Sequence, residues 1–150
     1  LQNKSQRVTS VATSIFYTAC KVPRRGDLIE IFRGSYRHWA VYVGDGSVVH
    51  LVVPSKSRTH LGVVREENLR AVVGNDQWQI NNSLDSTHNP RPADVIVTEA
   101  RSWVGREITY HSIRSNCEHF ATERRYGVSK IQNLFAKNKI CAAGSSFLPV

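Results

Sequence analysis

The sequence predicts an α+β fold, in which an antiparallel sheet from the first half of the chain packs against helices from the second half. Two stretches carry this prediction. β-Branched and aromatic side chains dominate residues 27–53, whereas apolar residues recur at helical spacing within residues 93–126. A chain of 150 residues is long enough to bury one hydrophobic core without disulfides or a structural metal.

The predicted strands are short and are separated by turns rich in glycine and polar residues. The compact turn Gly44-Asp45-Gly46 joins the two strongest of them into a hairpin. Residues 81–92, rich in Asn, Ser and Pro, predict a loop. In chain order the predicted strands are residues 27–32, 38–43 and 47–53, followed by three short β-like pieces at residues 62–64, 71–73 and 78–80.

Two helices are predicted after the loop. The first starts at Ala93 and stops at Gly105, because glycine is common just past a helix C-terminus. The second covers residues 115–126, since Ser115 and Glu118 match a capping box. Residues 108–113 predict a short strand or an extended link, and residues 129–139 a third helix. The first helix carries an apolar stripe of Val95, Ile96, Ala100, Trp103 and Val104.

Cys117 stands in the first turn of the second predicted helix. Unpaired N–H groups and the helix dipole at such a position stabilise a thiolate, so we expect a thiol pKa below that of free cysteine. The alternative is a small buried apolar residue, which is the common fate of a lone cysteine. A thiol nucleophile also needs a base within hydrogen-bond reach, and a third group to orient that base.

His38 and His50 lie in the two strands of the predicted hairpin, and the register decides whether they share a face. With a three-residue loop, Ala40 pairs with His50, and the two histidines are diagonal neighbours on one face, about 7 Å apart. With a two-residue Asp-Gly loop they would face opposite sides. We expect the first register, with Val43 opposite Ser47 and the last glycine of the turn in a left-handed conformation.

On a shared face, His38 would be the base for Cys117, and His50 would hold one tautomer of its imidazole. The plainer interpretation is that each histidine is a polar side chain of a strand. The remaining histidines show no comparable pattern and are interpreted as surface or structural residues; they are His60, His88, His111 and His119.

Five segments of the sequence together resemble the phospholipase A/acyltransferase family and lecithin:retinol acyltransferase, which carry an H-box and an Asn-Cys motif. The resemblance covers about residues 23–128. It implies a permuted papain-like (NlpC-type) thiol fold. The segments are Gly-Asp-Leu-Ile-Glu-Ile-Phe-Arg (26–33), Tyr-Arg-His-Trp-Ala-Val-Tyr-Val-Gly-Asp-Gly (36–46), Val-Val-His-Leu (48–51), Asn-Cys-Glu-His-Phe (116–120) and Arg-Tyr-Gly (125–127).

The resemblance also implies roles for individual residues. In that family the first histidine is the base, the second is its partner and the cysteine is the nucleophile, which assigns these roles to His38, His50 and Cys117. Further residues fall where the family has groups near its site, and these are Arg33, Tyr36 and Asn116. We expect no cofactor, and no metal, because no His/Cys cluster has ligand spacing.

Other features distinguish this chain from the cellular enzymes. It starts with Leu, contains no Met and has no apolar membrane anchor, which together predict a piece cut from a larger precursor. That combination resembles the H-box/NC 2A proteins of picornaviruses of the parechovirus and kobuvirus type. We therefore expect a basic extension at residues 1–22, an H-box/NC domain at 23–128 and a helix with a tail at 129–150.

The formal net charge of +8 favours contact with RNA phosphates or an anionic membrane surface, although a basic surface can also serve solubility alone. Three cysteines far apart favour a reducing compartment, here the host-cell cytoplasm, replication membranes or nucleus. The basic residues expected to bind nucleic acid lie near the two ends of the chain; they are Lys4, Arg7, Lys21, Arg24, Arg25, Lys130, Lys137 and Lys139.

Two functions therefore compete. The first is a viral replication accessory protein, not a protease, that binds RNA or host factors through its basic surface. The second is an active thiol phospholipase or acyltransferase, in which Cys117 forms a thioester with help from His38 and His50. Precursor origin and the missing anchor place the accessory role slightly ahead, whereas the intact cysteine and histidines favour the enzyme.

Overall fold

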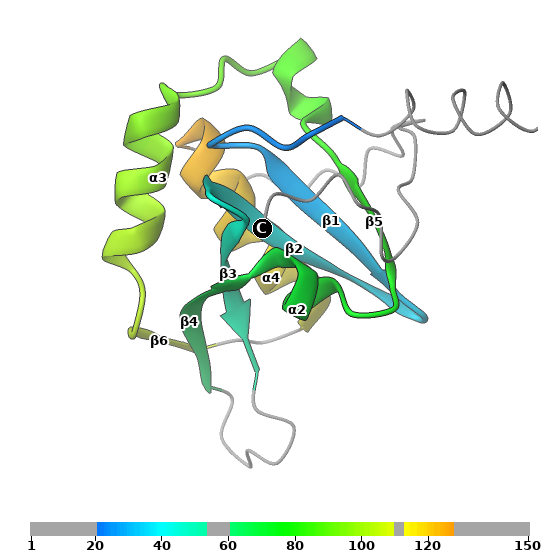
Figure 1. Ribbon diagram of the computed structural model, residues 1–150. Coiled ribbons are helices and arrows are strands. Elements are labelled where there is room, and N and C mark those ends of the chain that lie inside the picture. Colours follow the sequence, from blue (N-terminus) through cyan, green and yellow to red (C-terminus); the bar gives the residue numbers. More distant parts are fainter. Residues whose placement is uncertain (1–20, 54–60, 110–112, 128–150) are drawn as a thin grey trace, which may run out of the picture.

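The structure is a computed structural model that describes residues 21–53, 61–109 and 113–127, the first four of the last stretch by their backbone. In this part of the chain, six strands form one antiparallel sheet in the order β5-β1-β2-β3-β4-β6 (Figure 1). The strands are β1 (Leu28–Arg33), β2 (Tyr36–Gly44), β3 (Ser47–Val52), β4 (Leu61–Asn68), β5 (Gln77–Ile80) and β6 (Glu107–Thr109).

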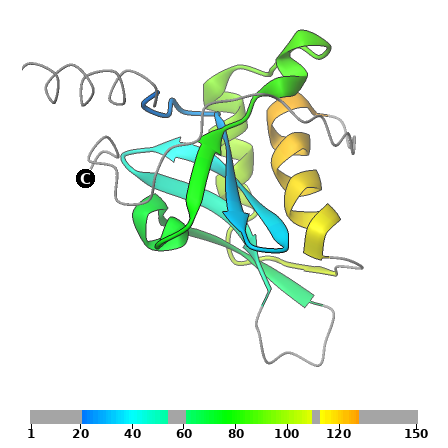
Figure 2. The same ribbon diagram turned by 90° about the vertical axis from the view of Figure 1, so that its right-hand side faces the viewer.

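Helices lie on both faces of this sheet. α3 (Ala93–Ser102) and α4 (Ile113–Tyr126) cover one face, and the short α2 (Leu69–Val73) lies on the other (Figure 2). A 3₁₀ turn, η1 (Ser83–Ser86), lies in the segment between β5 and α3. The α+β fold predicted from the sequence is thus confirmed, while the finer description as a permuted papain-like domain stays a prediction.

Two cores follow from this layering, because alternate residues of a strand point to opposite faces. Trp39, Val41 and Leu51 pack against the α3 and α4 side, in one cluster with Cys117 and Phe120. The residues between them on the strands pack against α2 and β5 in a second cluster, which consists of Ile29, Ile31, Ala40, Tyr42, Val48, Leu69, Val72, Val73 and Trp78. The central strands are therefore buried on both sides.

The hairpin between β2 and β3 has the expected register at the histidines, but its turn is shorter than predicted. Ala40 pairs with His50 as predicted, but the turn is the two-residue Asp45-Gly46 pair, with φ of 50° and 75°. Gly44, not Val43, lies opposite Ser47. The three-residue loop was therefore wrong. A bulge at Val43 adds one residue to β2 and restores the alignment that a plain two-residue turn would have lost.

The residues after β4 form a helix where a β-like piece was predicted. Residues 71–73 belong to α2, whose start is capped by the Asn68 side chain, which accepts a hydrogen bond of 2.9 Å from the Arg70 N–H. Gly74, with φ of 57°, ends the helix. Local capping and burial of Leu69 and Val73 thus override the β propensity of the valines.

Both long helices exist, with corrections in detail. The buried stripe of α3 is Ile96, Val97 and Ala100, whereas Val95 and Val104, predicted to join it, are 42% and 41% exposed. α4 begins at Ile113, so Cys117 is its fifth residue and Ser115 is not its cap. The predicted helix at 129–139 lies outside the described residues.

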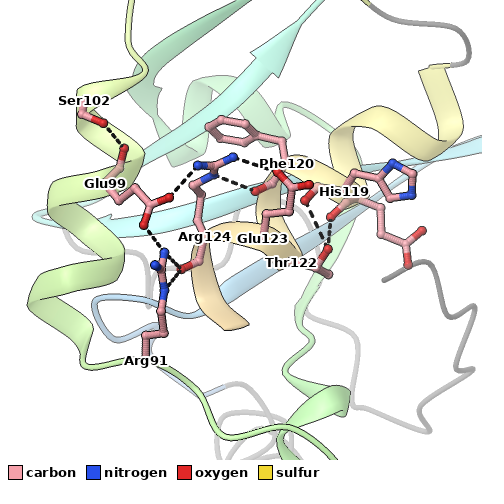
Figure 3. A network of polar contacts seen from close by, with 9 residues as sticks. Arg91, Glu99, Ser102, His119, Phe120, Thr122, Glu123 and Arg124 are labelled. Carbon is pink, nitrogen blue, oxygen red and sulfur yellow. Dashed lines mark hydrogen bonds and ion pairs between the residues drawn. The ribbon is translucent and has the colours of Figure 1, made fainter. Parts of the chain in front are cut away.

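The C-terminal end of α4 is held by arginines. The Arg124 guanidinium donates to Glu99 of α3 at 2.7 Å and to Glu123 at 2.9 Å (Figure 3). It also lies over the Trp103 ring, 4.7 Å from its centroid. Arg91 bonds both Glu99 and the backbone carbonyl of Arg124 (Figure 3). These contacts fix the end of α4 against α3.

The next residue, Arg125, connects the same helix end to the start of β1. It donates to Asp85 through two nitrogens, at 3.0 and 2.6 Å, and to the Gly26 carbonyl at 2.7 Å. The Tyr126 hydroxyl donates to the same carboxylate at 2.7 Å. Gly127, with φ of 73°, ends the helix. The Arg-Tyr-Gly segment singled out in the sequence therefore has a structural role here.

Candidate active site

His38 and His50 meet side by side on one face of the hairpin, as the predicted register requires. The His38 Nε2 and His50 Nδ1 atoms are 2.7 Å apart, and the rings cross edge to face with centroids separated by 5.0 Å. Both side chains are buried, with 8% and 5% of their surfaces exposed. The pairing of Ala40 with His50 makes the two histidines diagonal neighbours, which is the origin of this contact.

A third polar side chain continues this row on the next strand. His50 Nε2 lies 2.7 Å from a carboxylate oxygen of Glu67 in β4. Glu67 was not singled out in the sequence. Its place follows from the pairing of His50 with Arg65, two residues earlier on β4. The sequence carries no alternation that would signal it, because residues 65–68 (Arg-Glu-Glu-Asn) are all polar.

Cys117 lies on the α4 side of the sheet, at the point where β2 and β3 separate. The paired register of these strands ends at Ala40 and His50, beyond which β2 pairs with β1 and β3 with β4. The Cys117 thiol donates to the Leu51 carbonyl, 3.6 Å away, and its sulfur accepts from the Trp39 backbone. These two backbone groups belong to the residues that directly follow His50 and His38.

This arrangement explains how one thiol can serve a site on the opposite face. If the ladder continued by one pair, Trp39 and Leu51 would face each other; instead, both bond the Cys117 sulfur. The sulfur therefore contacts the backbone of both strands from the α4 side. The structure thus brings the thiol next to the backbone of both histidine strands, and it packs α4 against the hairpin as predicted.

Burial determines the pKa of each group. Desolvation is the main cause that lowers the His38 pKa to about 3, with the nearby His50 and Arg33 adding to it. The His50 pKa is also lowered by burial, although Glu67 acts in the opposite direction. Burial raises the Cys117 pKa to about 11, against the opposing effects of Arg33 and the Trp39 backbone.

The predicted low-pKa thiolate is therefore wrong. Cys117 is 2% exposed, and because α4 begins at Ile113 the thiol lies a turn away from the helix end, where the dipole is strongest. Desolvation of the charged form outweighs the remaining support. The site therefore holds a neutral thiol and neutral imidazoles at neutral pH.

The predicted supporting residues have different outcomes. Arg33 acts on the pKa of both histidines and of Cys117, while its guanidinium bonds Asp76, at 3.0 Å, and the Val72 carbonyl. Tyr36 lies opposite Arg33 in the β1–β2 register, two residues before His38 on the same strand face. The side chain of Asn116 lies outside the description.

Glu30, inside the first motif, is a fully buried carboxylate on the α4 side of the sheet. It accepts hydrogen bonds from Arg37 at 2.9 Å, Gln79 at 2.6 Å and Asn81 at 2.8 Å. These partners satisfy the charge and join β5 to the central strands. Glu30 also helps to raise the Glu118 pKa, after desolvation of that group. This cluster is a structural support beneath the site.

The basic residues expected to bind nucleic acid are described only in part. Lys21, Arg24 and Arg25 are exposed ahead of β1. The others lie outside the described residues; they are Lys4, Arg7, Lys130, Lys137 and Lys139. RNA binding stays a prediction.

No group of three metal-ligating side chains occurs in the described part of the chain. Among the same residues, no helix has the length and apolarity to cross a bilayer.

The fold places a helix thiol against the backbone of the two strands that carry the paired histidines, which are the groups of a cysteine–histidine site. Comparison with known families agrees. Residues 21–130 match the model of the lecithin retinol acyltransferase family. The chain belongs to this family.

The relatives extend the likeness over most of the chain. It is 45% identical over 119 residues to human "Phospholipase A and acyltransferase 3", which covers 72% of this chain and 74% of that protein. It is 44% identical over 123 residues to human "Phospholipase A and acyltransferase 4", with 75% of each chain covered. The rat "Phospholipase A and acyltransferase 5" is 42% identical over 120 residues, 75% of this chain and 42% of its own length.

These relatives favour the second of the two competing functions. Their names refer to phospholipase A and acyltransferase activity, and none of the three is a viral 2A protein. The resemblance to acyltransferases is confirmed at the level of the family. The finer expectation of a picornavirus protein stays a prediction from the sequence.

Proposed function

We propose that this chain is a cysteine-dependent phospholipase A/acyltransferase, with Cys117 as nucleophile, His38 as base and His50 as the group that orients it. One observation carries the proposal: His38 and His50 are hydrogen-bonded at 2.7 Å on adjacent strands, next to a thiol held between the same two strands. The names of the relatives support the same substrate class, an ester of a glycerophospholipid.

The reaction divides into two acyl transfers. The Cys117 proton moves to His38 as the sulfur attacks the ester carbonyl, and the lysophospholipid alkoxide leaves with that proton, which produces a thioester. Water or the amine of a second lipid then attacks the thioester while His38 takes its proton. Cys117 recovers that proton as the fatty acid or acylated amine departs.

The pKa values suit this order of events. A His38 pKa near 3 keeps the imidazole unprotonated at neutral pH, ready to accept the thiol proton. A Cys117 pKa near 11 disfavours a resting thiolate, which protects the sulfur from reaction before an ester is present. Proton transfer and attack are then coupled in one step, with the developing charges held near Arg33 and the Trp39 backbone.

The exposed basic residues Lys21, Arg24 and Arg25 support contact with an anionic lipid surface. Such contact is electrostatic and weakens with salt, because counterions screen exposed charges within about 10 Å at 0.1 M ionic strength. Association with phosphatidylserine vesicles should therefore fall as salt rises. Binding unchanged from low to high salt would remove this part of the proposal. A viral accessory role has no comparable support from the described contacts.

The central test is hydrolysis of phosphatidylcholine in mixed micelles by the full chain. Cys117→Ala should lower the turnover rate by about 10³-fold or more, and His38→Ala by roughly 10²–10⁴-fold. Mass spectrometry of the protein trapped during turnover should find an acyl group on Cys117. The control is Arg101→Gln, whose side chain forms an exposed pair with Glu66 on the other face of β4 from the histidines. Wild-type turnover by the Cys117→Ala protein would end the proposal.

A further inference from the structure

We propose that Glu67 is a positioning residue that fixes the protons of both histidines, so that His38 keeps an unprotonated Nδ1 for the thiol. The inference rests on the proposed function for its consequence, but its geometry stands alone. Three side chains form one hydrogen-bonded row: His38 Nε2 to His50 Nδ1 at 2.7 Å, then His50 Nε2 to Glu67 at 2.7 Å.

The sheet register builds this row. His38 and His50 are diagonal neighbours because Ala40 pairs with His50, and His50 and Glu67 are diagonal neighbours because His50 pairs with Arg65. All three side chains therefore project from the same face of three consecutive strands. Two such diagonal contacts connect the buried His38, at one end of the row, to Glu67, at the other end, whose side chain is 42% exposed.

Proton counting along the row assigns the tautomers. An ionised carboxylate only accepts, so the Glu67 contact requires a proton on His50 Nε2. Neutral imidazole carries one ring proton, so His50 Nδ1 is bare and must accept from His38 Nε2. His38 then carries its proton on Nε2, and its Nδ1 has a free lone pair. The two histidines are neutral in this state, as their burial requires.

Without the carboxylate, the histidine pair alone does not choose between two states. The reverse order, with His50 donating to His38 Nε2, satisfies the same 2.7 Å contact but moves the His38 proton to Nδ1. In that state His38 is a donor toward the thiol and is useless as a base. Glu67 removes this second state, because its oxygen and a bare His50 Nε2 would both be acceptors.

Glu67 is the negatively charged neighbour of His50, and its effect on the His50 pKa opposes that of two nearby arginines. Arg33 and Arg65 both act on His50 in the direction that disfavours its protonation, and Glu67 acts in the other direction by hydrogen bond and charge. On the other face of β4, the neighbouring Glu66 bonds Arg101 of α3 at 3.0 Å. Glu66 is thus a matched carboxylate, one residue away, with no part in the row.

The test reads the tautomers directly, by ¹⁵N NMR of the histidine rings in the full chain. In the wild-type protein, His38 and His50 should both show the Nε2–H form at neutral pH. Glu67→Ala should add the Nδ1–H form at both rings, and Glu67→Gln, whose amide oxygen still accepts, should restore much of the Nε2–H form. Glu66→Gln should leave the ring nitrogens unchanged.

The kinetic arm uses phosphatidylcholine in mixed micelles. Glu67→Ala should lower kcat by about 10–100-fold with little change in KM, which is the usual cost of losing a partner that orients a histidine. Glu67→Gln should recover part of kcat. A merely structural role would lower stability without shifting the tautomers.

The two arms separate the inference from the proposed function. Unchanged tautomers in Glu67→Ala overturn the inference, even if the wild-type protein hydrolyses phosphatidylcholine. Shifted tautomers in a protein that lacks hydrolysis confirm the positioning and instead reject the proposed function. Shifted tautomers with undiminished kcat overturn the claim that the His38 proton position matters to the reaction.

Discussion

The strand face that carries His38 and His50 and the C-terminal end of α4 both bury ionisable groups, but with different partners. On the strand face, each imidazole has one or two partners, and burial keeps both rings neutral. At the helix end, Arg124 and Arg125 stay charged, and each is surrounded by several acceptors. Cys117 lies near the start of α4, and the two arginines lie at its end.

The two regions differ in how many hydrogen-bond partners surround each buried group. Arginines with multiple acceptors repay their desolvation by hydrogen bonding, so the end of α4 is fixed and has no reason to exchange protons. Burial lowers the pKa of both histidines, and each ring has only one or two hydrogen-bond partners. The fixed end of α4 therefore contrasts with a strand face that holds neutral imidazoles, which are the form that can accept a proton.

The largest expected effect tests the fixed end. Asp85→Ala removes the carboxylate that accepts from Arg125 and from the Tyr126 hydroxyl, and it leaves a guanidinium that is 9% exposed without its main partner. We expect the free energy of unfolding to fall by about 3 kcal/mol, measured by urea denaturation. The tautomers of His38 and His50 should not change. A loss below about 0.5 kcal/mol would show that this end of α4 is not held by charge.

The second effect concerns the thiol. With a pKa of about 11, Cys117 should react with iodoacetamide roughly 100-fold more slowly at pH 7 than a free thiol of pKa 9.0 with equal access. The rate should rise about tenfold per pH unit up to pH 11. Alkylation followed by mass spectrometry measures it. A Cys117 that reacts as fast at pH 5.5 as at pH 8 would restore the activated thiolate that the sequence predicted.

The third effect is the pH dependence of stability. The His38 pKa is about 3 in the folded chain and 6.5 in the unfolded chain, so the unfolded state binds more protons between these values. The free energy of unfolding therefore falls as pH drops below 6.5, by about 1.4 kcal/mol per pH unit from this group. Between pH 6.5 and 5, the wild-type protein should lose about 2 kcal/mol more than His38→Gln. Parallel pH curves for the two proteins would contradict the buried neutral imidazole.

The smallest effect is expected at an exposed pair. Arg101 and Glu66 are 45% and 31% exposed and join α3 to β4 at 3.0 Å. Solvent screens such pairs, so Arg101→Gln should change the free energy of unfolding by about 0.5 kcal/mol or less. Thermal unfolding at two salt concentrations measures this. If Arg101→Gln changed the free energy of unfolding as much as Asp85→Ala, buried arginines with several partners would stabilise the fold no more than a single surface pair.

Several features follow from local sequence alone. The structure confirms four of these predictions: the two strands of the hairpin, the helix that begins at Ala93, the end of α4 at Gly127 and the shared face of the histidines. They share one cause. Each depends on short-range periodicity, on turn residues or on glycine, which act over a few residues.

Other features depend on residues far apart in the chain, and these the sequence did not determine. Glu67 joins the histidine row only because β4 pairs with β3 in one register, and Cys117 lies between strands only because β2 and β3 separate after Ala40 and His50. The pKa of Cys117 rises because tertiary packing buries the thiol. This desolvation outweighs the lowering of the pKa that the sequence predicted from the helix position. The sequence by itself singled out Cys117, His38 and His50, whereas the tertiary structure decided their burial, their partners and the direction of their pKa shifts, since desolvation and strand register exist only in the folded chain.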